Sequence, residues 1–476
     1  MKYLLTVLFL PAFWGMIFAQ CPEGDVVISS LEEAEQFLSK YPDCTEISGN
    51  FKIGPGEGMA QTRIERLPVF EKIKVIKGNL SIENNQWLKV APEFPQLDTV
   101  GGALTFKNNK DFTGVVAFPV KSVGGDFSIG VAGWQHFIEL KVPGLEYIGG
   151  NLWVHLNLTW YSFFPKLKKV GNAIQIFDQP AKITQVNDFH ELESCDAIRL
   201  RMDNPNLSIQ GFEKLKEING LDLELKTKGP VNIGTFIQPK HITLNNLSPE
   251  LRLDFLSGIT ELKGLDLFEM HPEAMKYFPN LRKIEYFYGN SRSRDAWPEI
   301  SNLPAIDTVE NLILGGQTMH WLPAFKNIGK SFQIRGMMDS TLFALADNCP
   351  YAPEISINGI TNYQLKEIGH PIKVKTDKFR ISGLSILKSL KGIDLSKIEA
   401  KAITFESLGI ESLEDLEGTP VEDCTVIFKD NSKIKGCSFE RLCKWNENRP
   451  ADQPAVIFKG FNGVCSNDAY EKACNN

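Results

Sequence analysis

The seven residues Val123-Gly-Gly-Asp-Phe-Ser-Ile129 carry the motif that decides the fold of this chain. The motif recurs with small changes along residues 47–176, where successive copies begin 22 to 29 residues apart. A near-fixed period of this length is the signature of a solenoid, in which each repeat forms one turn of a coil. The copies are Ile47–Ile53, Ile76–Ile82, Val100–Phe106, Val123–Ile129, Ile148–Val154 and Val170–Ile176, with a seventh at Ile328–Ile334.

Within each copy, apolar residues occupy the first, fifth and seventh positions. This alternation is typical of a short β-strand with one face in a core, and the glycine before the strand permits a sharp bend. A second motif, such as Phe94-Pro-Gln-Leu-Asp-Thr-Val100, precedes most copies, and its proline restrains the chain as it turns. The chain is therefore predicted to be mainly β, with the strands of successive turns stacked in parallel.

Asparagine recurs at a fixed offset after three of these strands, at Asn85, Asn109 and Asn157. Asparagines stacked at the corner of a coil can bond to each other and to backbone groups that would otherwise lack partners. We interpret them as a structural ladder. The alternative is contact with sugar or calcium, but the nonapeptide of calcium-binding repeats is absent.

Residues 1–19 have the pattern of a secretory signal peptide. Lys2 supplies the positive start, and Tyr3–Phe18 is an almost wholly apolar run that is too short to span a membrane comfortably. We expect a secreted or cell-surface protein whose mature chain is not inserted in the membrane.

Residues 20–48 are predicted to form an N-terminal cap. Ser30-Leu-Glu-Glu33 is a capping box at the start of a short amphipathic helix. Cys21 and Cys44 flank that helix and are expected to form a disulfide in an oxidising compartment. A cap is required because the first turn of a solenoid otherwise exposes a strand edge and an open core.

The opening from Cys21-Pro-Glu-Gly-Asp-Val-Val27 to Cys44-Thr-Glu-Ile-Ser-Gly-Asn50 resembles receptor L domains, the leucine-rich-repeat-like lobes of insulin- and EGF-type receptors. Such modules also occur in secreted bacterial surface proteins, and the opening is most similar to those. The resemblance covers residues 21–176. It implies a right-handed parallel β-helix whose sheet faces serve as binding surfaces, and it implies no catalytic activity.

The solenoid is predicted to run over residues 49–190 and to continue in degenerate form over 191–430. The alternative for the second part is another L-domain-like lobe, joined near 180–192. Irregular spacing still allows strands to be placed here, at Ala197–Leu200, Leu221–Leu225, Val231–Ile233, His241–Leu244, Leu251–Phe255 and Leu312–Leu314.

Residues 431–476 are predicted to form a C-terminal disulfide cap. Four cysteines allow three pairings, and spacing does not choose among them. Our working prediction pairs Cys437 with Cys465 and Cys443 with Cys474. The same cysteine pattern closes the bacterial proteins that the opening resembles.

Nine cysteines leave at least one thiol unpaired. Cys195, Cys349 and Cys424 lie within the repeats and are interpreted as buried thiols. None has a neighbouring histidine, so no zinc site is predicted. We predict no metal site and no cofactor.

An enzyme is the main alternative to a binding protein, because parallel β-helices include polysaccharide lyases and hydrolases. Such sites need clustered carboxylates or basic residues on one sheet face. The seven histidines share no repeat position, and no catalytic motif is present. We therefore predict no catalytic residues.

A net charge of −7 argues against nucleic acid as the partner. Binding of an extracellular protein or polysaccharide through the solenoid surface is the favoured function, with a purely structural surface protein as a further alternative. Alternation predicts that Trp153 and His155 point outward, and aromatic residues gather around them. The candidate ligand patch is Trp134, Trp153, His155, Trp160, Tyr161 and Phe163.

Overall fold

The structure is a computed structural model that divides into two compact units. Unit 1 comprises Met1–Lys182 and Asp188–Leu192, and unit 2 comprises Ile183–Asn187 and Glu193–Asn476. The residues that it describes are 21–58, 60–130, 139–155, 163–178, 183–234, 238–248, 250–268, 272–291, 306–316, 327–337, 349, 351–359, 372–435, 437, 439–445, 449, 455–460 and 465–474.

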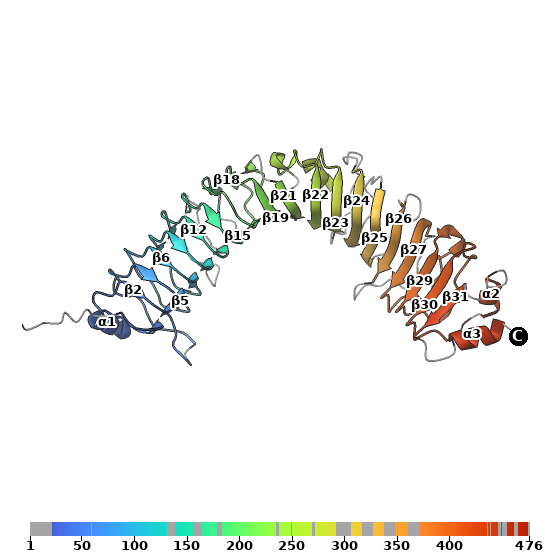
Figure 1. The fold of residues 1–476 in the computed structure, drawn as a ribbon, viewed down its shortest axis with the longest axis horizontal. Helices are drawn as coiled ribbons and strands as arrows, with labels where there is room; N and C mark the ends of the chain where they lie inside the picture. Colours follow the sequence, from blue (N-terminus) through green and yellow to red (C-terminus); the bar gives the residue numbers. More distant parts are fainter. Residues whose placement is uncertain are drawn as a thin grey trace, which may run out of the picture. The chain divides into compact units, whose positions relative to one another are not determined.

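Unit 1 is a parallel β-solenoid, and its main sheet holds one strand from each turn (Figure 1). The fifth positions of the repeated motif are in register, so Leu80, Leu104 and Phe127 lie on successive strands. The main sheet comprises β1 (Val26–Ile28), β3 (Phe51–Ile53), β5 (Leu80–Glu83), β7 (Leu104–Lys107), β10 (Phe127–Gly130), β13 (Leu152–His155) and β15 (Ala173–Asp178).

Short strands on the other sides of the coil complete each turn of unit 1. The first position of the motif ends these strands, as at Ile47, and is fully buried. One sheet holds β2 (Glu46–Ile47), β4 (Val75–Ile76), β6 (Thr99–Val100), β9 (Ser122–Val123), β12 (Tyr147–Ile148) and β14 (Lys169–Val170), and another pairs β8 (Val115–Ala117) with β11 (Glu139–Lys141).

The predicted asparagine ladder is present at two of its three positions. Asn85 and Asn109 are buried, and Asn109 Oδ1 accepts bonds from the backbone and side-chain nitrogens of Asn85, both at 3.1 Å. Asn109 Nδ2 also donates to the carbonyl of Ile82 at 2.9 Å. The ladder thus satisfies backbone groups that face the core, as a structural role requires. Asn157 lies outside the described residues.

Unit 2 is built in the same way, with longer strands in its main sheet (Figure 1). Each strand pairs in parallel with the next described one. The sheet comprises β17 (Ala197–Met202), β19 (Glu217–Leu225), β21 (Gln238–Asn245), β22 (Glu261–Phe268), β23 (Lys283–Ser291), β24 (Thr308–Gly316), β25 (Asn327–Met337), β26 (Ala352–Asn358), β27 (Val374–Ser382), β29 (Ala402–Glu406), β30 (Thr425–Lys429) and β31 (Val456–Lys459).

Shorter elements of unit 2 lie between these strands. The expected strand at Leu251–Phe255 is not formed. Arg252 makes an isolated bridge to Pro230, and the following residues turn into a 3-10 helix that buries Leu256. The short elements are β18 (Ser208–Gly211), β20 (Val231–Ile233), η1 (Asp254–Leu256), η2 (Pro272–Tyr277), η4 (Leu395–Lys397) and β28 (Ile398–Glu399), and β16 (Gln185–Asp188) includes residues of both units.

The N-terminal cap is formed as predicted. Helix α1 (Leu31–Lys40) begins after Ser30, whose side chain accepts a bond from Glu33 N. The Phe37 ring of α1 packs edge-on against Phe51 of the first motif copy, with centroids 5.7 Å apart. Cys21 and Cys44 form a disulfide that ties the start of the cap to the residues after the helix.

The C-terminal cap confirms both predicted pairings, Cys437–Cys465 and Cys443–Cys474. The bonds join α2 (Phe439–Lys444) and its flank to α3 (Asn467–Cys474) and its flank. Tyr470 of α3 covers Phe458 of the last strand, with ring centroids 5.8 Å apart. The cap therefore closes the core at the last turn of unit 2. No helix in the described part of the chain is long and apolar enough to cross a membrane.

Candidate functional site

The exposed aromatic surface of unit 1 lies on β13 and β15. Trp153 is 39% exposed and His155 is exposed, as their places in the strand alternation predicted. The ring of Phe177, in register with His155, lies 6.3 Å from Trp153 and 6.2 Å from His155. We name Trp153, His155 and Phe177 the Trp153 patch. Phe177 was not among the predicted residues, although it follows the motif copy on the next turn.

Of the other four residues of the predicted patch, one is buried and three lie outside the described residues. Phe163 is only 2% exposed, and its backbone N–H donates to Asp188 Oδ2 at 2.6 Å. Its inclusion was wrong, because it belongs to the core beside Phe164, with ring centroids 6.4 Å apart. Trp134, Trp160 and Tyr161 lie outside the described residues.

Trp153 projects from a row of short or covered side chains. Its in-register neighbours are Ser128 and Gln175, which are 4% and 5% exposed. In the next row, Gly130 is in register with His155. A Cβ added to Gly130 would have no neighbouring atom closer than 3.8 Å, so the surface beside His155 is open. The indole is thus accessible over a nearly flat sheet, which suits a ligand with a flat face.

A second, polar surface lies on the outer face of unit 2, over the main-sheet strands β19, β21, β22 and β23. Strand pairing places Asp222, Thr243, Asp266 and Tyr288 in one row across four strands. Gly220, His241, Gly264 and Tyr286 form the next row on the same strands. We name Asp222, His241, Asp266 and Tyr286 the Asp266 cluster.

His241 is held by Asp266 on the following strand. Its Nε2 lies 2.9 Å from Asp266 Oδ2. A Cβ on Gly264 would lie 2.1 Å from Nδ1 of the ring, so the imidazole occupies space that only glycine leaves open. The hydrogen bond to Asp266 raises the pKa of His241, and the charges of Asp266 and Asp222 act in the same direction. The second oxygen of Asp266 is buried without a partner in the described part of the chain.

Asp222 is half-buried and has no hydrogen bond or ion pair to any described residue. Burial raises the pKa of its carboxyl, against the opposing charges of Arg199 and Arg201. Glu224 is the next outward-facing residue on β19, and unlike Asp222 it has partners. It accepts bonds from Asn245 and from Arg201. The lack of a hydrogen-bonding partner is therefore specific to Asp222 and is not shared by Glu224 on the same face.

Aromatic side chains of β22 and β23 lie beside the carboxylates of the Asp266 cluster. Tyr286 is next to Gly264 in its row, and burial together with the charge of Asp266 raises the pKa of its hydroxyl. Tyr288 packs edge-on against Phe268, with ring centroids 5.2 Å apart. The surface thus combines hydrogen-bonding groups with ring faces.

The Asp266 cluster could not be predicted from the sequence, because the histidines share no repeat position. The usable signal was the strict alternation in Leu221-Asp-Leu-Glu-Leu225 and Leu265-Asp-Leu267, which places each aspartate on the outer face. Without the register between strands, that signal does not show which outward residues are neighbours.

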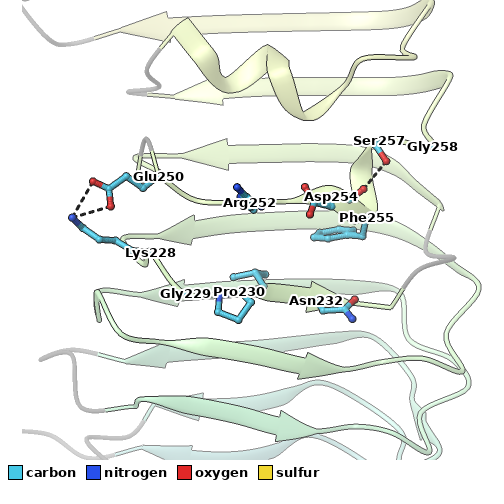
Figure 2. A pocket seen from close by; sticks show the side chains of 11 residues that line it. Lys228, Gly229, Pro230, Asn232, Glu250, Arg252, Asp254, Phe255, Ser257 and Gly258 are labelled. Carbon is cyan, nitrogen blue, oxygen red and sulfur yellow. Dashed lines mark hydrogen bonds and ion pairs between the residues drawn. The ribbon is translucent and has the colours of Figure 1, made fainter.

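One pocket in unit 2 lies beside β20 and η1. It measures about 740 Å³ and includes Arg252, Asp254 and Phe255. Figure 2 shows Lys228 and Glu250 joined across one end of it, and their ion pair is 2.8 Å long. Because its charges are mixed and this pair is already neutralised, we assign no ligand to the pocket.

No group of metal-ligating residues occurs in the part of the chain that the structure describes. Three cysteines lie outside the disulfides, Cys195, Cys349 and Cys424. Burial raises the pKa of the first two thiols to about 12 and that of Cys424 to about 11. These values describe unreactive thiols and not nucleophiles.

Comparison with known families gives one match. Residues 43–116 match the model of the receptor L domain family. No curated protein and no solved structure matches the chain. The matched range includes β3, β5, β7 and the Asn85–Asn109 ladder, and together with the solenoid fold it supports a receptor-L-domain-like repeat protein.

Neither candidate surface lies within the matched range. The Trp153 patch follows it in unit 1, and the Asp266 cluster lies in unit 2. The match therefore supports a binding role in general, while the residues proposed to bind are argued from geometry.

Proposed function

We propose that the chain is a secreted, non-catalytic binding module that recognises an extracellular protein or polysaccharide through the outer faces of its main sheets. The receptor L domain match supports a binding role. The three disulfides near the termini suit an oxidising extracellular compartment. Residues 1–19 would act as the signal peptide that directs the chain there.

The observation that carries this proposal is the exposure of Trp153. A large aromatic side chain usually packs into a core or lies in an interface. Here 39% of Trp153 remains exposed between the covered side chains of Ser128 and Gln175, beside the exposed imidazole of His155. Aromatic residues with a polar edge dominate the energetics of many interfaces, and a flat ring can also stack on a sugar.

A glycan-array screen of the full oxidised chain tests this function. We expect saturable binding that Trp153→Ala weakens at least tenfold, a loss typical of an interface anchor. Trp87→Ala is the matched control, since Trp87 is 47% exposed in the same unit but lies in the turn after β5. Equal losses in both variants would contradict a specific role of the patch. Absence of glycan binding would shift the proposal to a protein partner.

The same ligands test the non-catalytic part of the proposal. Prolonged incubation of a bound oligosaccharide with the full chain should release no new reducing ends. Release that His241→Gln abolishes would instead support the enzyme alternative, because an imidazole held by a carboxylate can transfer protons.

A further inference from the structure

We propose that the outer face of β19–β23 is a separate carbohydrate-binding site, in which Asp222 and His241 hydrogen-bond sugar hydroxyls and Tyr286 contacts the sugar ring. Asp266 acts as a positioning residue that holds His241. The inference deepens the proposed binding function by naming a ligand class and a second set of residues. It does not depend on the Trp153 patch, which lies in the other unit.

Asp222 supplies the first argument, because a half-buried carboxylate without a donor is costly to keep. Two other acidic residues of this sheet, by contrast, have ion-pair partners. Glu224 is paired with Arg201 and Asn245, and Glu406 with Arg380 and Lys429. An acceptor left unpaired on an accessible face is ready to accept a hydrogen bond from a ligand.

The placement of His241 supplies the second argument. Its side chain is 41% exposed, yet its orientation is determined by Asp266, which is 18% exposed. Glycine stands on both neighbouring strands of its row, at Gly220 and Gly264. Gly264 leaves room for the ring to lie across the sheet, because a Cβ at that position would lie 2.1 Å from its Nδ1. A polar group that is both accessible and fixed in direction is suited to recognition.

The charges, hydrogen-bonding groups and aromatic rings of this surface favour carbohydrate over a cationic ligand. The positive charges of Arg199, Arg201 and Arg335 offset the carboxylates, so the surface does not favour a cation. Acceptors, donors and aromatic faces lie within a few strands of one another. A sugar hydroxyl both donates and accepts hydrogen bonds, while the ring offers C–H groups to an aromatic face. Carbohydrate fits this combination better than an ammonium or a guanidinium group does.

The size of the surface also suits an oligosaccharide. Asp222, Thr243 and Asp266 stand on three successive strands, and adjacent strands lie about 4.8 Å apart. The row from Asp222 to Asp266 therefore extends over roughly 10 Å, long enough for more than one sugar residue.

The test uses the full oxidised chain on an array of neutral oligosaccharides, with poly-lysine as a cationic probe. Asp222→Asn keeps the size of the side chain and removes its charge. We expect it to weaken binding of the best oligosaccharide about tenfold or more, as loss of a charge-assisted hydrogen bond does. Thermal unfolding of the same variant shows whether it remains folded.

Two control variants separate binding at this site from binding elsewhere on the chain. Glu406→Gln removes a paired carboxylate on β29 of the same sheet and should leave binding unchanged. Trp153→Ala tests the Trp153 patch, so that loss of binding at one surface can be distinguished from loss at the other. A folded Asp222→Asn variant with unchanged oligosaccharide binding would overturn the inference. So would binding of poly-lysine, and not of any oligosaccharide, that Asp222→Asn abolishes.

Discussion

Nε2 of His241 lies 2.9 Å from Oδ2 of Asp266, although the two residues are 25 positions apart and stand in different rows of the sheet. The ring reaches Asp266 by crossing over Gly264 on β22. One turn of the solenoid thus brings a histidine and an aspartate together on the outer face, where neither contributes to the core. The contact is one that packing of the fold does not require.

Gly264→Ala should displace the His241 ring, because the new Cβ would lie 2.1 Å from its Nδ1. Since the hydrogen bond to Asp266 raises the pKa of His241, its loss should move the NMR titration midpoint down towards the ordinary value. We expect destabilisation of about 1–3 kcal/mol, as for other overpacked sites. Gly258→Ala is the control, since nothing lies within 4 Å of its Cβ position. An unchanged His241 titration in Gly264→Ala would contradict the described geometry.

Asp222→Asn should stabilise the fold at neutral pH. The pKa of Asp222 is raised in the folded chain by burial, so its contribution to stability is present below the unfolded pKa and is lost as pH rises through the folded pKa. The variant should therefore have a higher free energy of unfolding than wild type at pH 7, and this advantage should vanish near pH 3. Denaturant titrations across pH measure the difference.

Glu406→Gln is the control for these titrations, because its effect on the free energy of unfolding at pH 7 should have the opposite sign. The hydrogen bond from Lys429 lowers the pKa of Glu406, so its stabilising contribution is present above the unfolded pKa and is lost as pH falls through the folded pKa. This variant should be less stable than wild type at pH 7 and approach it at low pH. The same pH trend in both variants would show that Asp222 is not the unsatisfied group described here.

Asn109→Ala should lower the free energy of unfolding by about 1–3 kcal/mol, because it leaves buried polar partners unsatisfied. The lost bonds are those to the nitrogens of Asn85 and to the carbonyl of Ile82. Asn172→Ala removes an exposed asparagine of the same unit and should change stability by less than about 0.5 kcal/mol. Similar effects of the two substitutions would argue against the ladder.

Thiol titration should distinguish the three cysteines outside the disulfides from the six within them. Burial raises the pKa values of Cys195 and Cys349 to about 12 and of Cys424 to about 11, so little thiolate forms at pH 8. The native chain should react slowly with a thiol reagent, and unfolding without reductant should expose three thiols. A different number after unfolding would contradict the disulfide assignment.

The two caps could be predicted because their signals are local. A capping box and flanking cysteines specify α1 and its disulfide within about one helix length, and the structure confirms both. At the other end, composition indicated a cap but left three pairings open. The structure pairs Cys437 with Cys465 and Cys443 with Cys474, and Tyr470 of α3 packs on Phe458 of the last strand.

Prediction of the candidate surfaces was less complete. Alternation correctly placed Trp153 and His155 outside, because the two faces of a strand have a period of two residues. It could not place Phe163, which follows the strand region and is buried where its backbone N–H donates to the carboxylate of Asp188, 25 residues later. Short-range patterns carry no information on what covers a corner of the coil.

The sequence by itself determined the solenoid, since a repeated alternation of apolar residues can bury its core only by stacking one turn on the next. It also determined which side chains point away from that core. Only the tertiary structure decided which of the outward residues meet, because parallel register sets the neighbours across strands. A slip of one residue in that register would separate Asp222, Thr243 and Asp266.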